Sequence, residues 1–365
     1  MGIQALSVPR TMKAALLKKP LEIAMEELPV PRPGSGEVLV KVMAVGVCGS
    51  DVHYYEHGRI GPYVVESPLI LGHECAGVVV ACGPGVTRFR PGDRVAVEPG
   101  VTCGRCALCK AGRYNLCPHV RFLATPPVDG AFVQYLVHRE DFLFAIPDSM
   151  SFEEAALIEP FSVAIHALNR AGFHPGQSAA VIGLGPVGLM TVAAARAFGA
   201  SLVIGCDREA ERMNAALKLG ADAVVEAGQD AAREIRRATD YIGVDVALET
   251  AGHPMAVQTA FQSVRRGGRM AVIGLPADPE VKFNIPHLCD NEIEVYGIFR
   301  YANTYAQGIS LMSAGLPGIR ELVTDRFDLE HTEQALTQAM TNKRTSLKVF
   351  VYPNGLPGAC DGPLA

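Results

Sequence analysis

The stretch that decides the fold reads SAAVIGLGPVGLM over residues 178–190 and continues to Asp207. The apolar run before Gly183 predicts a buried strand, and the alanine-rich segment after Gly188 predicts a helix. A second apolar run then ends at Asp207. Strand, glycine turn, helix, strand and acid, in this order, are typical of the βαβ unit that binds a dinucleotide.

Each glycine of this stretch has a physical role in that unit. Gly183 permits the tight turn, Gly185 lets the backbone approach a pyrophosphate, and Gly188 lets helix and strand pack closely. The helix N-terminus favours phosphate, and Asp207 stands where an acid binds the ribose 2′-hydroxyl. Because a carboxylate there repels a 2′-phosphate, the sequence favours NAD over NADP. The alternative is a glycine turn with no ligand.

Length and composition indicate an ordinary globular protein of about two domains. The 365 residues can bury a core without staples, and a net charge of −5 gives no indication of a nucleic-acid partner. We find neither a signal peptide nor a run of about 20 apolar residues that a membrane helix needs. Four of the ten cysteines fall within 15 residues at metal-like spacing. A reducing cytoplasm is therefore expected.

Two patterns of secondary structure divide the chain. Short apolar runs separated by Gly and Pro predict an irregular β-barrel before about Phe161. Alternating strands and helices follow, with strands expected at residues 179–183, 202–207, 223–225, 244–249, 269–274 and 294–297. We predict an α/β protein in which a doubly wound Rossmann domain (163–300) is inserted into a β-rich catalytic domain (12–162 and 301–352). Residues 1–11 and 353–365 are expected to be tails.

Four cysteines in one short segment predict a structural metal site. Cys103, Cys106, Cys109 and Cys117 are spaced by three, three and eight residues. Four thiolates around one ion suit zinc in a closed, structural site. Free buried cysteines are the alternative, and disulfides between neighbours three residues apart are less favourable.

A second, dispersed set of residues carries zinc-ligand chemistry. Cys48 follows one apolar run, His73 and Glu74 follow another, and Glu159 stands just before the nucleotide-binding region. Three protein ligands leave one position open for water or substrate. Alternatively, His73 and Glu74 make ordinary surface hydrogen bonds.

With these motifs in place, the chain resembles the zinc-dependent medium-chain dehydrogenases, and within them the sorbitol/xylitol (polyol) dehydrogenase group. The resemblance covers nearly all of residues 12–351. It is carried by segments 46–54, 71–74, 92–95 and 157–163, by the cysteine segment, by the glycine turn and by residues 299–301. It implies a GroES-like fold for the catalytic domain and a homo-oligomer, either a tetramer or a dimer.

The resemblance also implies roles for individual residues. Cys48, His73 and Glu74 bind the catalytic zinc, and Glu159 approaches it directly or through water. In alcohol dehydrogenases the third ligand is a second cysteine, so Glu159 favours the polyol group. The residues implied to line the polyol site are Tyr54, Glu159, Arg300 and Tyr301. Those implied to contact NAD, besides the three glycines, are Val187, Asp207, Arg212, Ile273, Leu275, Ile298 and Arg300. The intact cysteine segment departs from the animal sorbitol dehydrogenases.

We therefore predict NAD-linked oxidation of a secondary hydroxyl of a polyol. Zinc would bind the alcohol oxygen and lower its pKa, and a hydride would pass to nicotinamide. Our hypothesis for the proton is that Ser50 and His53, or zinc-bound water held by Glu159, carry it to solvent. The alternatives are another zinc-dependent alcohol or threonine dehydrogenase, a zinc-free quinone reductase, and a nucleotide-binding protein without activity. Cys48, His73 and the cysteine segment argue against the quinone reductase.

Overall fold

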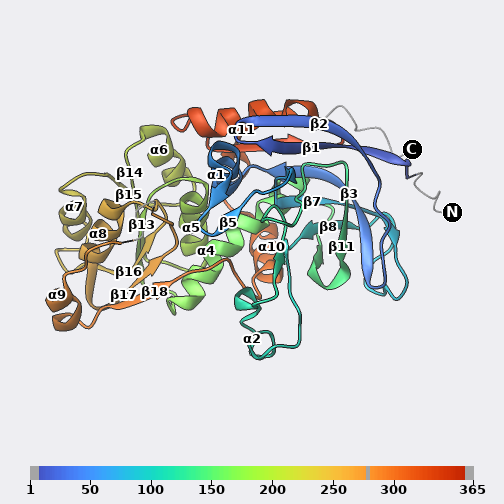
Figure 1. The fold of residues 1–365 in the computed structure, drawn as a ribbon. Helices are drawn as coiled ribbons and strands as arrows, with labels where there is room; N and C mark the ends of the chain where they lie inside the picture. The colour runs from blue at the N-terminus through green and yellow to red at the C-terminus, as the bar shows by residue number, and fades with distance from the viewer. Residues whose placement is uncertain (1–7, 277–279, 358–365) are drawn as a thin grey trace. The chain divides into compact units, whose positions relative to one another are not determined.

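The computed structural model describes residues 8–276 and 280–357, which form two compact units (Figure 1). The first unit comprises Met1–Glu159 and Val323–Ala365, and the second comprises Pro160–Leu322. An α/β fold with an inserted unit is confirmed. The boundaries at 162/163 and 300/301 stay a prediction. The compact units group residues 301–322 with the second unit, whereas the sequence-based prediction places them in the first.

The second unit is built on a six-stranded parallel sheet in the order β15-β14-β13-β16-β17-β18. This is the order of a doubly wound dinucleotide-binding sheet, in which the first strand lies near the centre. All six strands predicted from the sequence are present. They are β13 (Ser178–Ile182), β14 (Leu202–Asp207), β15 (Ala223–Glu226), β16 (Val244–Glu249), β17 (Val264–Val272) and β18 (Glu294–Gly297).

The helices of this unit pack on the sheet in two pairs. One pair is α5 (Pro186–Ala197) with α6 (Ala210–Lys218), and the other is α7 (Ala231–Arg237) with α8 (Pro254–Ser263). The unit also contains most of α4 (Ile158–Arg170), α9 (Ile285–Asp290), α10 (Tyr305–Ser313) and the short 3₁₀ segment η3 (Arg320–Leu322). Apolar side chains of β13, β16 and α8 make up much of its core.

The first unit contains a seven-stranded mixed sheet. Its main path runs β12-β8-β7-β3-β20-β19, and β11 also pairs with β3. A three-stranded sheet, β2-β1-β6, packs with it around one apolar core. The strands are β1 (Thr11–Lys19), β2 (Glu22–Pro29), β3 (Glu37–Gly46), β6 (Leu69–Ile70), β7 (Glu74–Cys82), β8 (Arg94–Val97), β11 (Tyr135–Arg139), β12 (Leu143–Ala145), β19 (Val323–Asp328) and β20 (Lys348–Tyr352).

Short elements complete this unit. The helices are α1 (Gly49–His57), α2 (Ala107–Lys110), α3 (Phe152–Ala156) and α11 (Thr332–Thr341). The 3₁₀ segments are η1 (Tyr114–Leu116), η2 (Glu140–Phe142) and η4 (Leu329–His331). Two small two-stranded sheets pair β4 (Arg59–Ile60) with β5 (Tyr63–Val64) and β9 (Gly100–Val101) with β10 (Arg121–Phe122).

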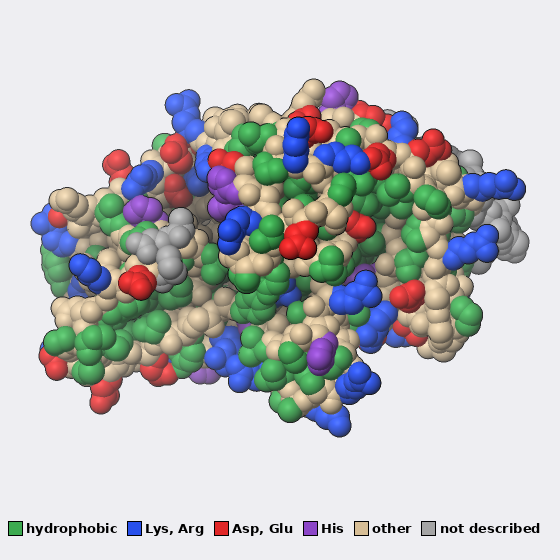
Figure 2. Space-filling model, viewed as in Figure 1, with side chains coloured by type: hydrophobic (Ala, Val, Ile, Leu, Met, Phe, Trp, Pro, Cys, Tyr) green, Lys and Arg blue, Asp and Glu red, His purple; other side chains and the backbone are tan. Residues whose placement is uncertain are grey.

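The surface carries charges of both signs. Figure 2 shows Lys and Arg side chains interspersed with Asp and Glu over the viewed face. Over residues 8–276 and 280–357, no helix has the length and apolar character to cross a bilayer. Such a mixed surface gives no reason to expect a polyanionic partner.

Candidate metal centres and cofactor site

Cys48 stands where strand β3 gives way to helix α1. It is the N-cap residue of α1, with an extended backbone at φ −96° and ψ 158°. Its backbone N–H donates to Asp51 Oδ2 at 2.9 Å, so the acid of the first turn fixes the entry into the helix. The thiol is half-buried, and its position is set by backbone hydrogen bonds on both sides.

The structure brings Cys48, His73 and Glu74 together. One donor atom from each lies within 4.8 Å of the others, and both His73 and Glu74 are buried. A thiolate, an imidazole and a carboxylate are all zinc ligands, and three of them leave a coordination position open. The chemistry of this donor set therefore fits a catalytic zinc ion, as the sequence predicted.

Asp51 orients His73 from behind. Its Oδ1 accepts the N–H of Gly72 at 2.9 Å and lies 3.6 Å from His73 Nδ1. This arrangement leaves the other ring nitrogen for a metal, which is the usual carboxylate–histidine–zinc relation. Burial by itself lowers the pKa of His73, but the charges of Asp51 and Cys48 raise that pKa well above its ordinary value. A metal must therefore displace a proton at this ring.

Lys348 packs against the other side of the donor set. It is the one Lys or Arg among the described residues whose side chain is buried. Its ammonium forms an ion pair with Glu74 Oε2 and donates to the carbonyl of Val47 at 2.9 Å. Burial lowers the pKa of Lys348, but the negative charges of Glu74, Cys48 and Glu159 outweigh burial and raise it. The side chain is therefore a buried cation beside the predicted metal ligands.

Glu159 is buried near this centre but lies outside the tight donor group. It is 5% exposed, stands at the start of α4, and contributes to the electrostatics of Lys348 and Cys75. Burial raises the pKa of the neighbouring Cys75 thiol to about 12, so that thiol stays neutral. The approach of Glu159 to a bound zinc ion, directly or through water, stays a prediction.

The residues predicted to move the proton lie on α1. Ser50 is half-buried and His53 is exposed, three residues apart and hence on one face of the helix. Partial burial and the nearby His57 lower the pKa of His53 below its ordinary value. Tyr54, 3% exposed, belongs to the first unit, whereas Arg300 and Tyr301 belong to the second. The grouping of these three around a polyol stays a prediction.

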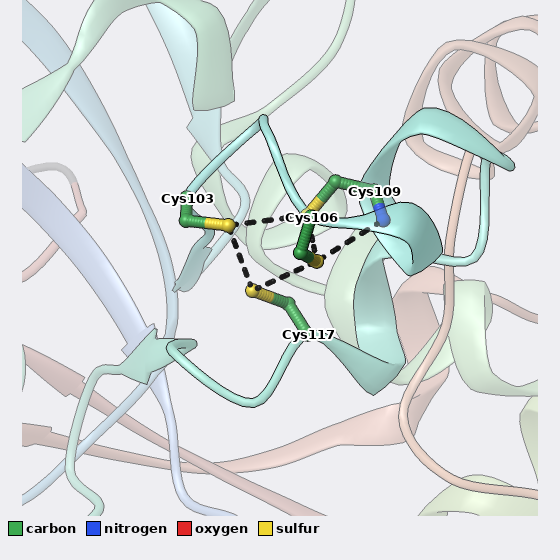
Figure 3. A group of neighbouring side chains, drawn as sticks. All are labelled: Cys103, Cys106, Cys109 and Cys117. Atoms are coloured by element: carbon green, nitrogen blue, oxygen red, sulfur yellow. Dashed lines mark hydrogen bonds between the residues drawn. The ribbon is translucent and has the colours of Figure 1, made fainter.

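The four cysteines of the segment 103–117 converge on one point (Figure 3). Their Sγ–Sγ distances are 3.9 Å (103 to 109), 3.4 Å (106 to 109), 3.9 Å (106 to 117) and 3.5 Å (103 to 117). A zinc ion with four sulfurs at about 2.3 Å would space those sulfurs by about 3.8 Å. The same distances are far too long for disulfides, which need about 2.05 Å. The set therefore fits a structural zinc ion.

The surroundings of these cysteines shift their pKa values in opposite directions. Backbone N–H donors from Arg105 and Cys106 lower the pKa of Cys103 to about 6. Burial, followed by the neighbouring Cys106, raises the pKa of Cys109 to about 11. No Asp or Glu occurs between Glu98 and Asp129, but exposed basic side chains do: Arg105, Lys110, Arg113 and Arg121. These cations offset the two negative charges that four thiolates and one zinc ion leave.

Two contacts tie the cysteine segment to the rest of its unit. The hydroxyl of Tyr114 donates to Glu98 Oε1 at 2.7 Å. Phe122, in the strand that follows Cys117, packs on the ring of His73 with centroids 5.6 Å apart. Burial raises the pKa of Glu98 to about 7 against the hydrogen bond from Tyr114, which lowers it. The segment is thus attached next to a predicted ligand of the catalytic metal.

In the second unit, the glycine turn has the geometry that the sequence predicts. Gly183 has φ +96°, and a Cβ on Gly188 would lie 1.9 Å from the carbonyl oxygen of Gly183. A Cβ on Gly185 would meet no protein atom within 4 Å, so the space beside its backbone is open to a ligand. Pro186 then begins α5, which directs its N-terminus to this turn. Val187 lies in that first helical turn, half-buried.

Asp207 closes the adenosine end of the predicted site. Its Oδ2 accepts the N–H of Leu184 at 2.6 Å, and its Oδ1 accepts the N–H groups of Arg208 at 2.7 Å and Glu209 at 3.0 Å. Arg212 Nη1 lies 3.9 Å from the same carboxylate. The Nε of Arg212 is buried and has no hydrogen-bond partner among the described residues. A ribose hydroxyl is one acceptor that would satisfy it, so these residues fit a dinucleotide.

Glu249 links the strand ends that bear the other predicted cofactor contacts. The carbonyl oxygen of this fully buried residue accepts the N–H of Ile273 at 2.8 Å, and its Oε1 accepts the N–H of Gly252 at 2.7 Å. Leu275 is 79% exposed and Ile298 is half-buried. Arg300 has φ +51° and stacks on Phe299. The contacts of Ile273, Leu275, Ile298 and Arg300 with NAD stay predictions.

The sequence-based reasoning assigned no role to Asp51, Glu98, Glu249 or Lys348. An acid three residues after Cys48 is a capping signal that could have identified Asp51. No comparable signal marks Lys348, since its partner Glu74 is distant in the chain.

Comparison with known proteins gives a consistent picture. Residues 34–148 match the family "Alcohol dehydrogenase GroES-like domain", and residues 186–314 match "Zinc-binding dehydrogenase". The chain is 59% identical to a sorbitol dehydrogenase of Bacillus subtilis, covering 95% of this chain and 99% of that protein. It is 41% identical to the sorbitol dehydrogenase of Rattus norvegicus, covering 91% and 93%. A solved oxidoreductase of unknown specificity from Escherichia coli is 38% identical, with a TM-score of 0.89 and coverage of 94% and 99%.

Proposed function

Because the chain belongs to the zinc-dependent medium-chain dehydrogenases, in the sorbitol dehydrogenase group, we propose that it oxidises a secondary hydroxyl of a polyol reversibly to the ketose. The single observation that carries the proposal is the convergence of Cys48, His73 and Glu74 in a chain 59% identical to a sorbitol dehydrogenase. A nucleotide-binding protein without activity would not need these three donors.

In this proposal Cys48, His73 and Glu74 hold the catalytic metal, with Glu159 close by. When bound there, zinc supplies a Lewis acid that lowers the pKa of an alcohol oxygen. Oxidation would remove a proton from that oxygen and a hydride from its carbon, and a nicotinamide cofactor bound at the glycine turn would supply the hydride acceptor. Tyr54, Arg300 and Tyr301 bind the polyol hydroxyls, and Ser50 passes the proton along α1 to His53. The exposure of His53 supports this route, since the proton must end in solvent.

We propose NAD rather than NADP as the hydride acceptor. The buried Asp207 carboxylate supports this choice because a 2′-phosphate brought beside it would meet like charge. Gly183, Gly185, Val187 and Gly188 would hold the pyrophosphate on the N-terminus of α5.

We also propose that Cys103, Cys106, Cys109 and Cys117 hold a second, structural zinc ion. Sulfur spacings close to those of a tetrahedral site support this assignment. Zinc bound by free thiolates needs a reducing compartment, so the proposed location is the cytoplasm. Elemental analysis tests the assignment: two zinc ions per chain would support it, and one would count against it.

A homo-oligomer, dimer or tetramer, is the proposed assembly. The exposed edge of strand β18, with Val295 42% exposed, supports association through that unit. Light scattering of the purified protein measures the mass directly, and a monomer at micromolar concentration would end the proposal.

The decisive test of function is formation of NADH from sorbitol, xylitol, galactitol and ribitol, beside ethanol and threonine. We expect turnover of at least one polyol with NAD, little with NADP, and loss of turnover after chelation. Turnover of ethanol or threonine alone would replace the polyol by another substrate class. The variant Glu159→Gln, which keeps the size of the side chain and removes its charge, should have lower turnover. Unchanged turnover would remove Glu159 from the mechanism.

A further inference from the structure

The carboxylate of Glu74 has two possible partners, a metal ion and the ammonium of Lys348. Cys48 and His73 place it in a metal site, because the three donor atoms lie within 4.8 Å of one another. The ammonium of Lys348 pairs with the same carboxylate through Oε2. Both side chains of this pair are almost fully buried, at 2% and 1% exposure, so water cannot screen the interaction.

Lys348 is built into this position by the backbone around it. It begins β20, which pairs with β3, and Val47 N–H donates to the carbonyl of Val349 at 2.9 Å. The ammonium in turn donates to the carbonyl of Val47, the residue before Cys48. A Cβ on Gly46 would lie 2.1 Å from Glu74 Oε2 and 2.9 Å from Lys348 Cε. A glycine at 46 is thus what leaves room for the pair.

The charges around the ammonium explain why it is there. Three groups that carry negative charge when ionised act on this ammonium: Glu74, Cys48 and Glu159. Lys348 is the only buried Lys or Arg in the described chain. Uncompensated buried anions are costly, so Lys348 stabilises the donor set when no metal is bound. A divalent ion at the same donors would be repelled by the ammonium and would have to draw Glu74 away from it.

We propose that Lys348 is a positioning residue that competes with the catalytic metal for the carboxylate of Glu74. This inference rests on the proposed metal site at Cys48, His73 and Glu74. Lys348 keeps Glu74 and the Val47–Cys48 backbone in place without metal, and it makes Glu74 an exchangeable ligand when metal is bound. If the ion pair were only structural, loss of Lys348 would loosen the metal site and speed the release of zinc.

The test replaces Lys348 by Met, which keeps the length of the side chain and removes its charge. The measured quantities are the rate at which a chromogenic chelator takes zinc, recorded with residual turnover, and the melting temperature with and without chelator. We expect Lys348→Met to release the catalytic zinc about tenfold more slowly or slower still. Its melting temperature should fall in the chelated protein and change little in the zinc-loaded protein. Zinc release as fast as in the wild type, or faster, would overturn the proposal.

Four further variants sharpen the test. Lys13→Met removes an exposed lysine that pairs with Glu330 in the same unit, and it should leave zinc release unchanged. Lys348→Arg keeps the charge and should release zinc at nearly the wild-type rate. In a Glu74→Gln background, which removes the contested carboxylate, Lys348→Met should slow zinc release clearly less than it does in the wild-type background, because only the direct repulsion of the ion is lost. An effect as large as in the wild-type background would refute competition for Glu74. If Lys348→Met does not fold, Lys348→Gln, which also removes the charge, replaces it in both backgrounds.

Failure of the proposed function looks different from failure of this inference. Wild-type protein that holds chelatable zinc but turns over no polyol discards the substrate and leaves the zinc-release comparison valid. Wild-type protein that holds no zinc at Cys48, His73 and Glu74 removes the premise, and with it the inference.

Discussion

Glu98 gives the sharpest prediction for the pH dependence of stability. It is 2% exposed, and burial raises its pKa from 4.5 to about 7 although Tyr114 donates to it. The folded protein therefore binds this proton more tightly than the unfolded chain does. The stability that Glu98 contributes is fully present below pH 4.5 and is lost as the pH rises through 7. A rise of this pKa from 4.5 to about 7 corresponds to about 3 kcal/mol.

Glu98→Gln removes the ionisation and keeps an oxygen that can accept from Tyr114. Relative to the wild type, the variant should gain about 3 kcal/mol of stability between pH 5 and pH 8. For a unit of this size that is about 6–12 °C in melting temperature. The backbone contacts of residue 98, including its carbonyl to His138 Nε2 at 2.9 Å, should be unaffected.

The assay is the melting temperature of wild type and variant from pH 5 to pH 8, with zinc present throughout. Glu321→Gln, which removes an exposed acid that pairs with Lys218, is the control and should show no such trend. A difference between Glu98→Gln and wild type that stays constant over this range would refute the reasoning. It would mean that the Glu98 carboxylate is ionised throughout despite its burial.

Three further predictions concern the two sites. Asp51→Asn should weaken zinc binding and lower turnover by about 10- to 100-fold, since it removes the charge behind His73, and chelator competition measures it. Asp207→Ala should lower kcat/KM with NAD by about tenfold and improve it with NADP; an unchanged ratio would contradict the assignment of the ribose site. Gly188→Ala should abolish NADH binding, because its Cβ would lie 1.9 Å from the carbonyl oxygen of Gly183; fluorescence titration with NADH would reveal any binding that survives.

The nucleotide-binding unit was predictable because its signals are local. Most of its strands are short apolar runs, and the six consecutive residues 183–188 predict the geometry of the glycine turn. The cysteine segment was predictable for the same reason, since four ligands within 15 residues leave few ways to fold. The sheet order then follows from the rules of parallel α/β connections.

Elements with few buried apolar side chains were missed. Strand β2 is half-buried or exposed along its whole length and is rich in acid, so its sequence gives no period-2 apolar signal. Its pairing with β1, residue by residue from Thr11↔Pro29, holds it in the sheet instead. Helix α11 also went unpredicted, because only three of its ten residues are buried.

The electrostatic partners of the metal ligands were beyond prediction for a different reason. Lys348 stands in an apolar run, and nothing near it in the sequence indicates that its charge is paired. Its pairing with Glu74 exists only because β20 lies beside β3. Residues 301–322 present the same difficulty, since only tertiary contacts group them with the second unit.

The position of β20 has a consequence for biosynthesis. This last strand of the chain lies between β3 and β19, inside the sheet that supports Cys48 and Glu74. On the ribosome, the uninterrupted Pro160–Leu322 unit is complete before β20 has been translated. The first unit therefore completes its sheet after the second unit has been synthesised. Until then, strand β3 has an unpaired edge where β20 later pairs. A nascent chain that stops short of residue 348 would carry a complete nucleotide-binding unit and a first unit that lacks the strand between β3 and β19.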